Sequence, residues 1–169
     1  ASNPFPLGTE LRDQYAIAEK VVILNNSFNG EGLYKDTRLA LNGLYTNTAF
    51  FELFDFHLQE GAVESILDEP YTMVLSHETA GKFFGDEDPV GKFIEIDTLG
   101  AFEVKGVVAE PEGKSHIQFE ALISLATLEI LDQKRDEPQF VNNWGTAWGS
   151  WIYLLLHENP DLDNIQQIL

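Results

Sequence analysis

The stretch from Tyr71 to Asp97, YTMVLSHETAGKFFGDEDPVGKFIEID, constrains the fold most, because each of its parts carries a local signal. Apolar and polar residues alternate over 71–76, which predicts a β-strand. Ser76 stands at the N-cap position of a following helix, and Gly85 can take the left-handed conformation that ends one. Asp88-Pro89-Val90-Gly91 carries residues that a type I turn prefers at its first, second and fourth positions. A second strand completes a predicted strand–helix–turn–strand unit.

The chain before this unit predicts one helix and two strands, followed by two short helices. Leu7, Leu11 and Tyr15 would share the buried face of the first helix, and the β-branched run 21–24 indicates a strand. The polar cluster over 25–32 predicts a loop or a hairpin connection. The ranges 37–45, 47–54 and 62–67 then predict a strand, a short helix and another short helix.

The chain after the central unit predicts further short elements. A turn at Leu99-Gly100 would lead into a strand over 102–108. We expect a strand over 119–125, a helix over 126–131, irregular structure over 132–149 and a strand over 150–157. Asn159-Pro160-Asp161 predicts the start of a last helix, with Leu162, Ile165 and Leu169 on one face, and we expect the parent protein to continue beyond it. Short strands mixed with short helices favour an α+β fold with mixed sheets.

Charge and composition exclude several classes of function. The chain has 28 acidic and 10 basic residues, for a net charge of −18. This charge opposes binding to nucleic acid or to an anionic membrane surface, because both need a basic face. Since the chain contains no cysteine, it has no disulfide framework and no thiolate nucleophile. Its apolar runs are far shorter than the roughly 20 residues that span a bilayer.

Titratable residues offer weak candidates for chemistry. The carboxylates of Asp86-Glu87-Asp88 would suit calcium, but they lack the spaced ligands of an EF-hand loop, and an acidic turn is usually only solvated. The four histidines have no zinc-binding spacing. Adjacency of Ser115 and His116 does not aim the imidazole at the hydroxyl, and no GxSxG motif is present. We therefore expect no catalytic residue, no metal and no cofactor.

Trp144, Trp148 and Trp151 are the candidate contact residues for a partner or substrate. Three indoles within eight residues, separated by Gly145 and Gly149, could form a stacking platform for a sugar or for an apolar residue of a partner. The alternative, which we favour, is a satellite core under a long loop.

The central stretch also resembles the core motif of MacB-like periplasmic domains, which occur in FtsX-family ABC transporter permeases. In VLSHETAGKFFGDEDPVGKFIEID, as in that family, a strand is followed by a Ser-led helix, a Phe-Gly, an acidic run and Pro-x-Gly-Lys. Residues 48–61 resemble the family's FFxxFxxxxxxG segment, and 102–119 resemble its later strand and SHxxF segment. Residues 7–24 resemble its opening helix and strand, so the ordered resemblance covers most of 5–130.

The resemblance implies a non-catalytic domain on the periplasmic side of the bacterial inner membrane, set between membrane helices of a permease. It implies an ATPase domain or subunit and a second permease copy as partners, with a periplasmic substrate or partner protein that the domain would move. It also implies two lobes. We expect a porter-like lobe over 1–114, a smaller inserted lobe over 115–151 and a return to the first lobe over 152–169.

Two rival functions remain open at this stage. A carbohydrate- or peptide-binding module would use the three tryptophans and requires exposed indoles. An extracytoplasmic hydrolase would use carboxylates and His116 and requires a concave pocket that holds a carboxylate with a perturbed pKa. The hydrolase ranks last, because no spacing of a nucleophile and a base supports it.

Overall fold

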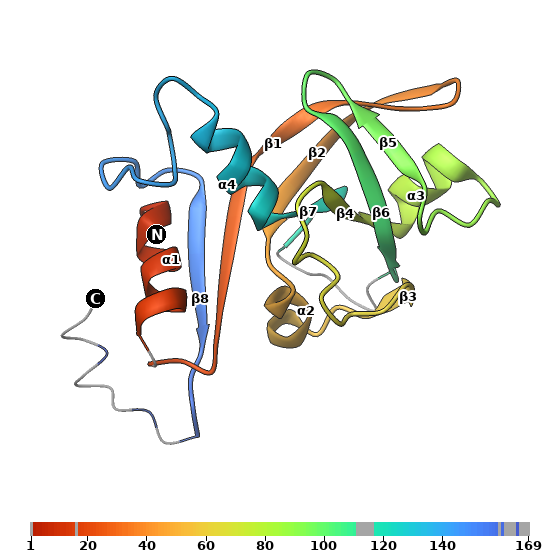
Figure 1. Ribbon diagram of the computed structural model, residues 1–169. Helices are drawn as coiled ribbons and strands as arrows, with labels where there is room; N and C mark the ends of the chain where they lie inside the picture. The colour runs from red at the N-terminus through yellow and green to blue at the C-terminus, as the bar shows by residue number, and fades with distance from the viewer. Residues whose placement is uncertain (1, 16, 111–116, 159, 161–164, 166–169) are drawn as a thin grey trace.

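The computed structural model describes residues 2–15, 17–110, 117–158, 160 and 165. Within them, short helices are mixed with strands without regular alternation, which confirms the α+β class (Figure 1). The elements are α1 (Phe5–Gln14), β1 (Lys20–Tyr34), β2 (Thr37–Thr46), α2 (Ala49–Phe54), β3 (Leu58–Glu60), β4 (Thr72–Ser76), α3 (His77–Phe84), β5 (Phe93–Ile96), β6 (Gly100–Val108), β7 (Ala121–Ser124), α4 (Leu125–Gln133) and β8 (Ser150–Leu155).

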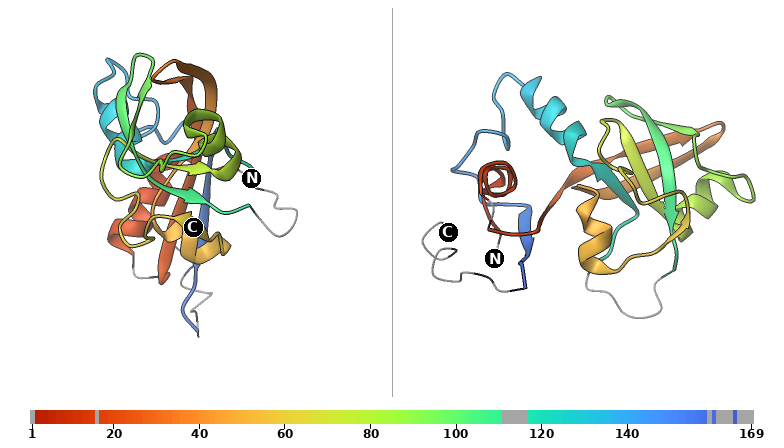
Figure 2. Two further views of the ribbon diagram at one scale, coloured as in Figure 1. Left: turned by 90° about the vertical axis from the view of Figure 1, so that its right-hand side faces the viewer. Right: turned by 60° about the horizontal axis from the view of Figure 1, so that its bottom comes forward.

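Six strands close into a ring. The pairing order β2-β7-β4-β6-β5-β1 returns to its start because β1 also pairs with β2. Two of the pairings, β2 with β7 and β4 with β6, are parallel, and the other four are antiparallel. The short strand β3 pairs with β6, and β8 extends the sheet from the first half of β1. Two views show α1 and β8 beside that first half, away from the ring (Figures 1 and 2).

The polar cluster over 25–32 lies inside β1, so the prediction of a loop or hairpin there was wrong. Residues 20–25 pair with β8, and residues from 25 onward pair with β2, with a bulge between Asn25 and Phe28. The amide of Asn25 is buried and donates to Ser150 Oγ at 2.8 Å. At Gly30 and Gly32 a Cβ would come within 2.9 Å of Ile96 or Phe83 side-chain atoms. These residues therefore form no turn. Asn25 lies where the pairing with β8 ends and the pairing with β2 begins, and the two glycines allow close packing.

The other edge of β1 is covered by one side chain. Asn47 follows β2, where that strand has turned away from the first half of β1. Its Oδ1 accepts from the backbone N–H of Ile23 at 3.3 Å, and its Nδ2 donates to the carbonyl of Val21 at 2.9 Å. A side-chain amide thus occupies the hydrogen-bonding position that a neighbouring strand would otherwise fill.

Two apolar clusters hold the elements together. The larger one includes the interior of the ring, where Phe28, Met73 and Phe102 are at most 2% exposed. The ring of Phe28 contacts Tyr45 and Phe102 edge to face. The smaller cluster lies under α2, with Phe50 fully buried at its centre. Tyr45 belongs to the larger cluster, and its burial there raises the pKa of its hydroxyl to about 12.

The central unit is confirmed in its strands and helix and corrected in its turn. Ser76 caps α3 by accepting from the backbone N–H of Thr79 at 3.2 Å, and Gly85 ends the helix with φ 59°. The turn lies one residue later than predicted, because Lys92 N–H donates to Pro89 O at 3.1 Å. Gly91 has φ 79° at the third position, as a type II turn requires.

Two helix predictions need correction. Residues 62–67 form turns, since Ser65 has φ 57° and the segment makes only i to i+3 backbone bonds, such as Ile66 to Val63. For α1, Leu11 is buried as predicted and is joined by Phe5 and Gly8, whereas Leu7 is only half-buried and Tyr15, the C-cap residue after the helix, is 40% exposed. The other predicted strands and helices up to residue 157 are present, and the irregular range predicted over 132–149 begins at 134 because α4 extends to Gln133. The predicted last helix falls largely outside the described residues.

One sheet contains strands from both of the predicted lobes. β7 comes from the range 115–151, and it pairs with β2 and β4 from the range 1–114. The boundaries at 114 and 151 stay a prediction. None of the helices in the described part of the chain has the length and apolar character needed to cross a membrane.

Two glycine substitutions test the packing. A Cβ at Gly106 would lie 2.7 Å from the carbonyl oxygen of Glu60. We expect Gly106→Ala to lower the free energy of unfolding by about 1–3 kcal/mol, because β6 and β3 would have to move apart. Gly81 lies in α3, and a Cβ there would point into open space, so Gly81→Ala should raise stability by about 0.5–1 kcal/mol. Urea denaturation measures both, and equal effects of the two changes would contradict this account.

Candidate partner-contact surface

The three tryptophans lie where the irregular segment 134–149 leads into β8, but they do not all face solvent. Trp148 is 81% exposed and Trp144 is 51% exposed, so the favoured interpretation as a satellite core was wrong for these two. Trp151 is half-buried and packs against the smaller apolar cluster. Among the described residues, no ring contact joins any two of the three indoles. Their role in contacting a partner stays a prediction.

The segment that carries Trp144 and Trp148 is anchored by Asp132, near the end of α4. Asp132 is buried, with only 1% of its surface exposed. Its carboxylate accepts from the backbone N–H groups of Gln139, Phe140 and Val141 at 2.9, 2.9 and 2.8 Å. Hydrogen bonds to an ionised acceptor are stronger than neutral ones. The segment therefore returns to the fold at a fixed place, although it has no regular secondary structure.

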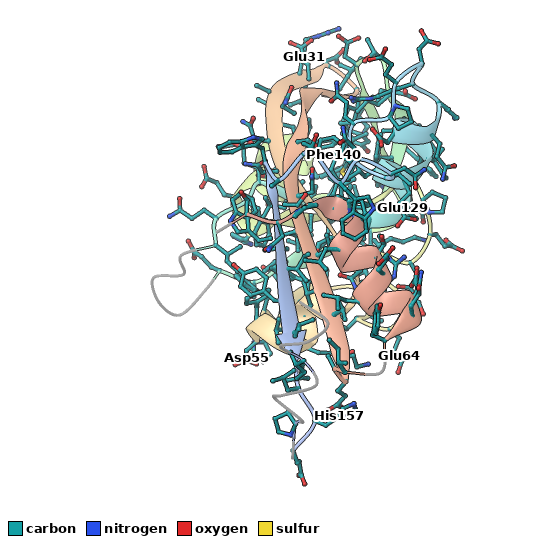
Figure 3. All side chains as sticks on the ribbon, turned by 90° about the vertical axis from the view of Figure 1, so that its left-hand side faces the viewer. Glu31, Asp55, Glu64, Glu129, Phe140 and His157 are labelled. Atoms are coloured by element: carbon teal, nitrogen blue, oxygen red, sulfur yellow. The ribbon has the colours of Figure 1, made fainter. Side chains whose placement is uncertain are left out.

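Sequence reasoning missed Asp132, because the bonds form between a helix end and a loop seven to nine residues later. A lone carboxylate at a helix end is usually exposed. Phe140 adds a second anchor, since it is buried and its ring contacts Phe5 of α1 edge to face at 6.4 Å. Figure 3 labels Phe140 and Glu129, which lie on the face of the molecule that carries α1 and β8.

A cleft of about 320 Å³ lies between α1, α4 and the segment that ends at Trp144. Trp144 and Val141 line it together with three carboxylates, from Glu10, Asp13 and Glu129. Arg12 lies beside two of these, with Nε 2.6 Å from Asp13 Oδ1 and Nη2 3.5 Å from Glu129 Oε1. The hydrogen bond from Arg12 lowers the pKa of Asp13. The cleft therefore combines one indole with a surplus of negative charge.

A larger open cleft of about 1190 Å³ lies at the end of the ring where β7 begins. Of its three described carboxylates, from Glu78, Glu110 and Glu120, two are engaged: Glu120 Oε2 accepts from the backbone N–H of Asn42 at 2.6 Å, and Glu78 pairs with Lys82 at 2.6 Å. The hydrogen bond from Lys82 lowers the pKa of Glu78. A general acid needs the opposite shift. His116, which the hydrolase hypothesis requires, lies outside the described residues.

The acidic turn at 86–88 uses its carboxylates within the fold. Glu87 accepts from Tyr34 Oη at 3.0 Å and from Lys35 Nζ at 2.6 Å, which ties the β1–β2 hairpin to the end of α3. Asp88 Oδ1 accepts from the backbone N–H of Val90 at 2.9 Å. Within the described ranges, no group of three or more His, Cys, Asp or Glu side chains is arranged to hold a metal ion.

Asp132 is the residue whose removal should disturb this surface most. We expect Asp132→Ala to lower the free energy of unfolding by about 3 kcal/mol, because three backbone N–H groups lose a charged acceptor. Acrylamide should then quench the fluorescence of Trp144 and Trp148 more strongly, since the segment is released. Asp136→Ala is the matched control, because that carboxylate is exposed in the same segment. An equally small effect of both changes would show that Asp132 does not anchor the segment.

Comparisons with known proteins place the chain in a family. The sequence matches the MacB-like periplasmic core domain over residues 2–169. None of the curated proteins matches the chain. A solved domain of a proposed permease from Porphyromonas gingivalis has 18% identity and a TM-score of 0.75, and the match covers 99% of this chain and 68% of that one.

Two further solved structures share the fold. The periplasmic region of MacB from Actinobacillus actinomycetemcomitans has 16% identity and a TM-score of 0.68, with coverage of 99% of this chain and 72% of that one. The extracellular domain of the noncanonic ABC-type transporter YknZ from Gram-positive bacteria has 15% identity and a TM-score of 0.63, with coverage of 99% and 78%. Since the family match spans 2–169, this chain belongs to the family of MacB-like periplasmic core domains.

Proposed function

We propose that this domain transmits motion from the membrane part of an ABC transporter permease to a substrate or partner protein in the periplasm. An ATPase domain or subunit on the cytoplasmic side would drive the motion, and a second permease copy would supply a second such domain. The inner membrane is the proposed location of the parent protein. The observation that carries the proposal is membership of the MacB-like periplasmic family over residues 2–169.

The strand pairing supports a mechanical role, because it joins the two parts of the domain through a single element. β1 has 15 residues, which corresponds to about 50 Å of extended chain. Its first half pairs with β8 and its second half with β2 and β5. A displacement applied at α1 and β8 would therefore reach the ring through a continuous hydrogen-bonded strand. Such a body moves as a unit, whereas a flexible linker would absorb the displacement.

Distances between spin labels in the intact transporter test the proposal. The domain has no cysteine of its own, so Asp36→Cys at the exposed β1–β2 turn introduces a single labelling site in this domain, with any cysteine elsewhere in the transporter replaced by serine. In the reconstituted transporter, we expect the distance between the two copies to differ between the nucleotide-free state and the ATP-bound state. An interspin distance that does not respond to nucleotide would contradict the proposal.

A second pair of labels within one copy separates rigid motion from internal deformation. Glu64 is exposed and belongs to the segment between β3 and β4. With labels at Asp36→Cys and Glu64→Cys of one copy, we expect the same distance in both nucleotide states. A change within the copy would mean that the domain deforms during the cycle and does not transmit motion as a stiff body.

The proposal also includes a non-catalytic role for the domain. Among the described carboxylates that line the larger cleft, Glu78 pairs with Lys82, which lowers its pKa, and Glu120 accepts from the backbone N–H of Asn42. A carbohydrate-binding module built on three stacked indoles receives less support, because Trp151 packs inward while Trp144 and Trp148 face solvent. Contact with a partner through the two exposed indoles fits the mechanical role.

A further inference from the structure

We propose that the cleft between α1 and α4, together with Trp144 and Trp148, is a docking surface for a protein partner that inserts a lysine or arginine side chain beside Trp144. The inference rests on the proposed partner-moving function and adds the chemistry of the contact and its place on the domain. It concerns only the described residues of α1, α4 and the segment 139–148.

The exposed indoles are the first observation. Tryptophan is enriched among the residues that dominate binding energy at protein interfaces, so an exposed indole is a candidate contact residue. Trp148 is 81% exposed and Trp144 is 51% exposed. Neither belongs to the apolar clusters of the fold. Their exposure therefore serves no packing purpose within this chain.

The anchoring of the segment is the second observation. Asp132 holds three consecutive backbone N–H groups, and Phe140 is buried against α1. Beyond these anchors, Asn143 makes a turn by accepting from the backbone N–H of Gly145 with its Oδ1 at 3.0 Å. A surface that is ordered before binding loses less entropy when a partner arrives. The segment that carries the two indoles is thus held in place before a partner binds.

The charge of the cleft selects the partner. Glu10, Asp13 and Glu129 line it, no basic residue is among its described lining residues, and the neighbouring Arg12 offsets one of the three negative charges. The face of an indole attracts a cation, and nearby carboxylates strengthen that preference. Since the whole chain carries a net charge of −18, its field also favours the approach of a basic surface.

Other occupants fit less well. An anionic lipid surface or a nucleic acid would be repelled by the carboxylates. A bare metal ion would leave the exposed indoles unused. A cleft of about 320 Å³ beside an exposed aromatic residue has room for one long basic side chain, while Trp148 meets an apolar part of the same partner. The combination points to a protein surface in which basic and apolar residues alternate.

A peptide titration of the 169-residue chain tests the inference without any nucleotide. The probe is an eight-residue Gly/Ser peptide with two lysines and one leucine, and the comparison peptide has glutamates in place of the lysines. We expect the indole N–H resonance of Trp144 and the amide resonance of Val141 to shift with the lysine peptide alone. The shifts should shrink as salt is raised from 50 to 500 mM, conditions of about 14 Å and 4 Å screening length.

Three variants locate the contact. Glu10→Gln and Trp144→Leu should each weaken binding of the lysine peptide about threefold, the first through lost charge and the second through the lost aromatic face. Glu95→Gln is the matched control, because that exposed carboxylate on β5 lines neither cleft. Equal shifts with the glutamate peptide, no shift with the lysine peptide, or equal weakening by Glu10→Gln and Glu95→Gln would overturn the inference.

The two proposals can fail separately. The lysine peptide could bind at Trp144 while the distance between spin-labelled copies is the same with and without nucleotide. In that case the docking surface is supported and the transmission of motion is contradicted. If the distance responds to nucleotide and the peptide shifts no resonance near Trp144, the mechanical role stands and the docking surface is overturned.

Discussion

The fold depends on the change of partner within β1. This strand pairs with β8 over its first half and with β2 over its second half, and its ladder with β2 is broken by a bulge between Asn25 and Phe28. The break is tolerated because Asn25, which is fully buried, donates to Ser150 and accepts from the backbone N–H of Ser27 at 3.0 Å. A buried amide with its polar atoms satisfied stabilises the bulge, whereas an apolar residue there would leave backbone and hydroxyl groups without partners. The ladder that closes the ring and the ladder that holds β8 both include Asn25.

Local signals made the central unit predictable from sequence. The cap at Ser76 and the alternation of β4 and β5 act over a few residues, and the structure confirms them. The cluster over 25–32 carries similar signals, yet it forms a strand, because its glycines make room for Ile96 and Phe83 from distant parts of the chain. A turn signal and a packing requirement both use glycine, and a single sequence does not distinguish them. The turn near Pro89 moved by one residue for a local reason, since a positive φ suits Gly91 at the third position of a type II turn.

The contact surface was predictable only in its residue types. Three nearby tryptophans indicated a contact or a small core, and the structure separates Trp151, which packs inward, from the two exposed indoles. Trp151 lies within β8, whereas Trp144 and Trp148 belong to the irregular segment before it. The anchor at Asp132 and the carboxylates of α1 that line the cleft depend on how helices pack, which periodicity alone does not give. The resemblance to a family identified the fold, but it carried no information on this surface.

Asn47 has a consequence for the behaviour of the domain in solution. Without its side chain, the edge of β1 at residues 21–23 would present a free donor and a free acceptor beside the apolar side chains of Val21, Val22 and Ile23. Such an edge is a template on which a second molecule can add a strand, and repeated addition leads to aggregation. One amide that imitates a neighbouring strand removes this template without adding a further strand to the fold. At this edge, a single side chain therefore keeps copies of the domain from adding to one another at high concentration.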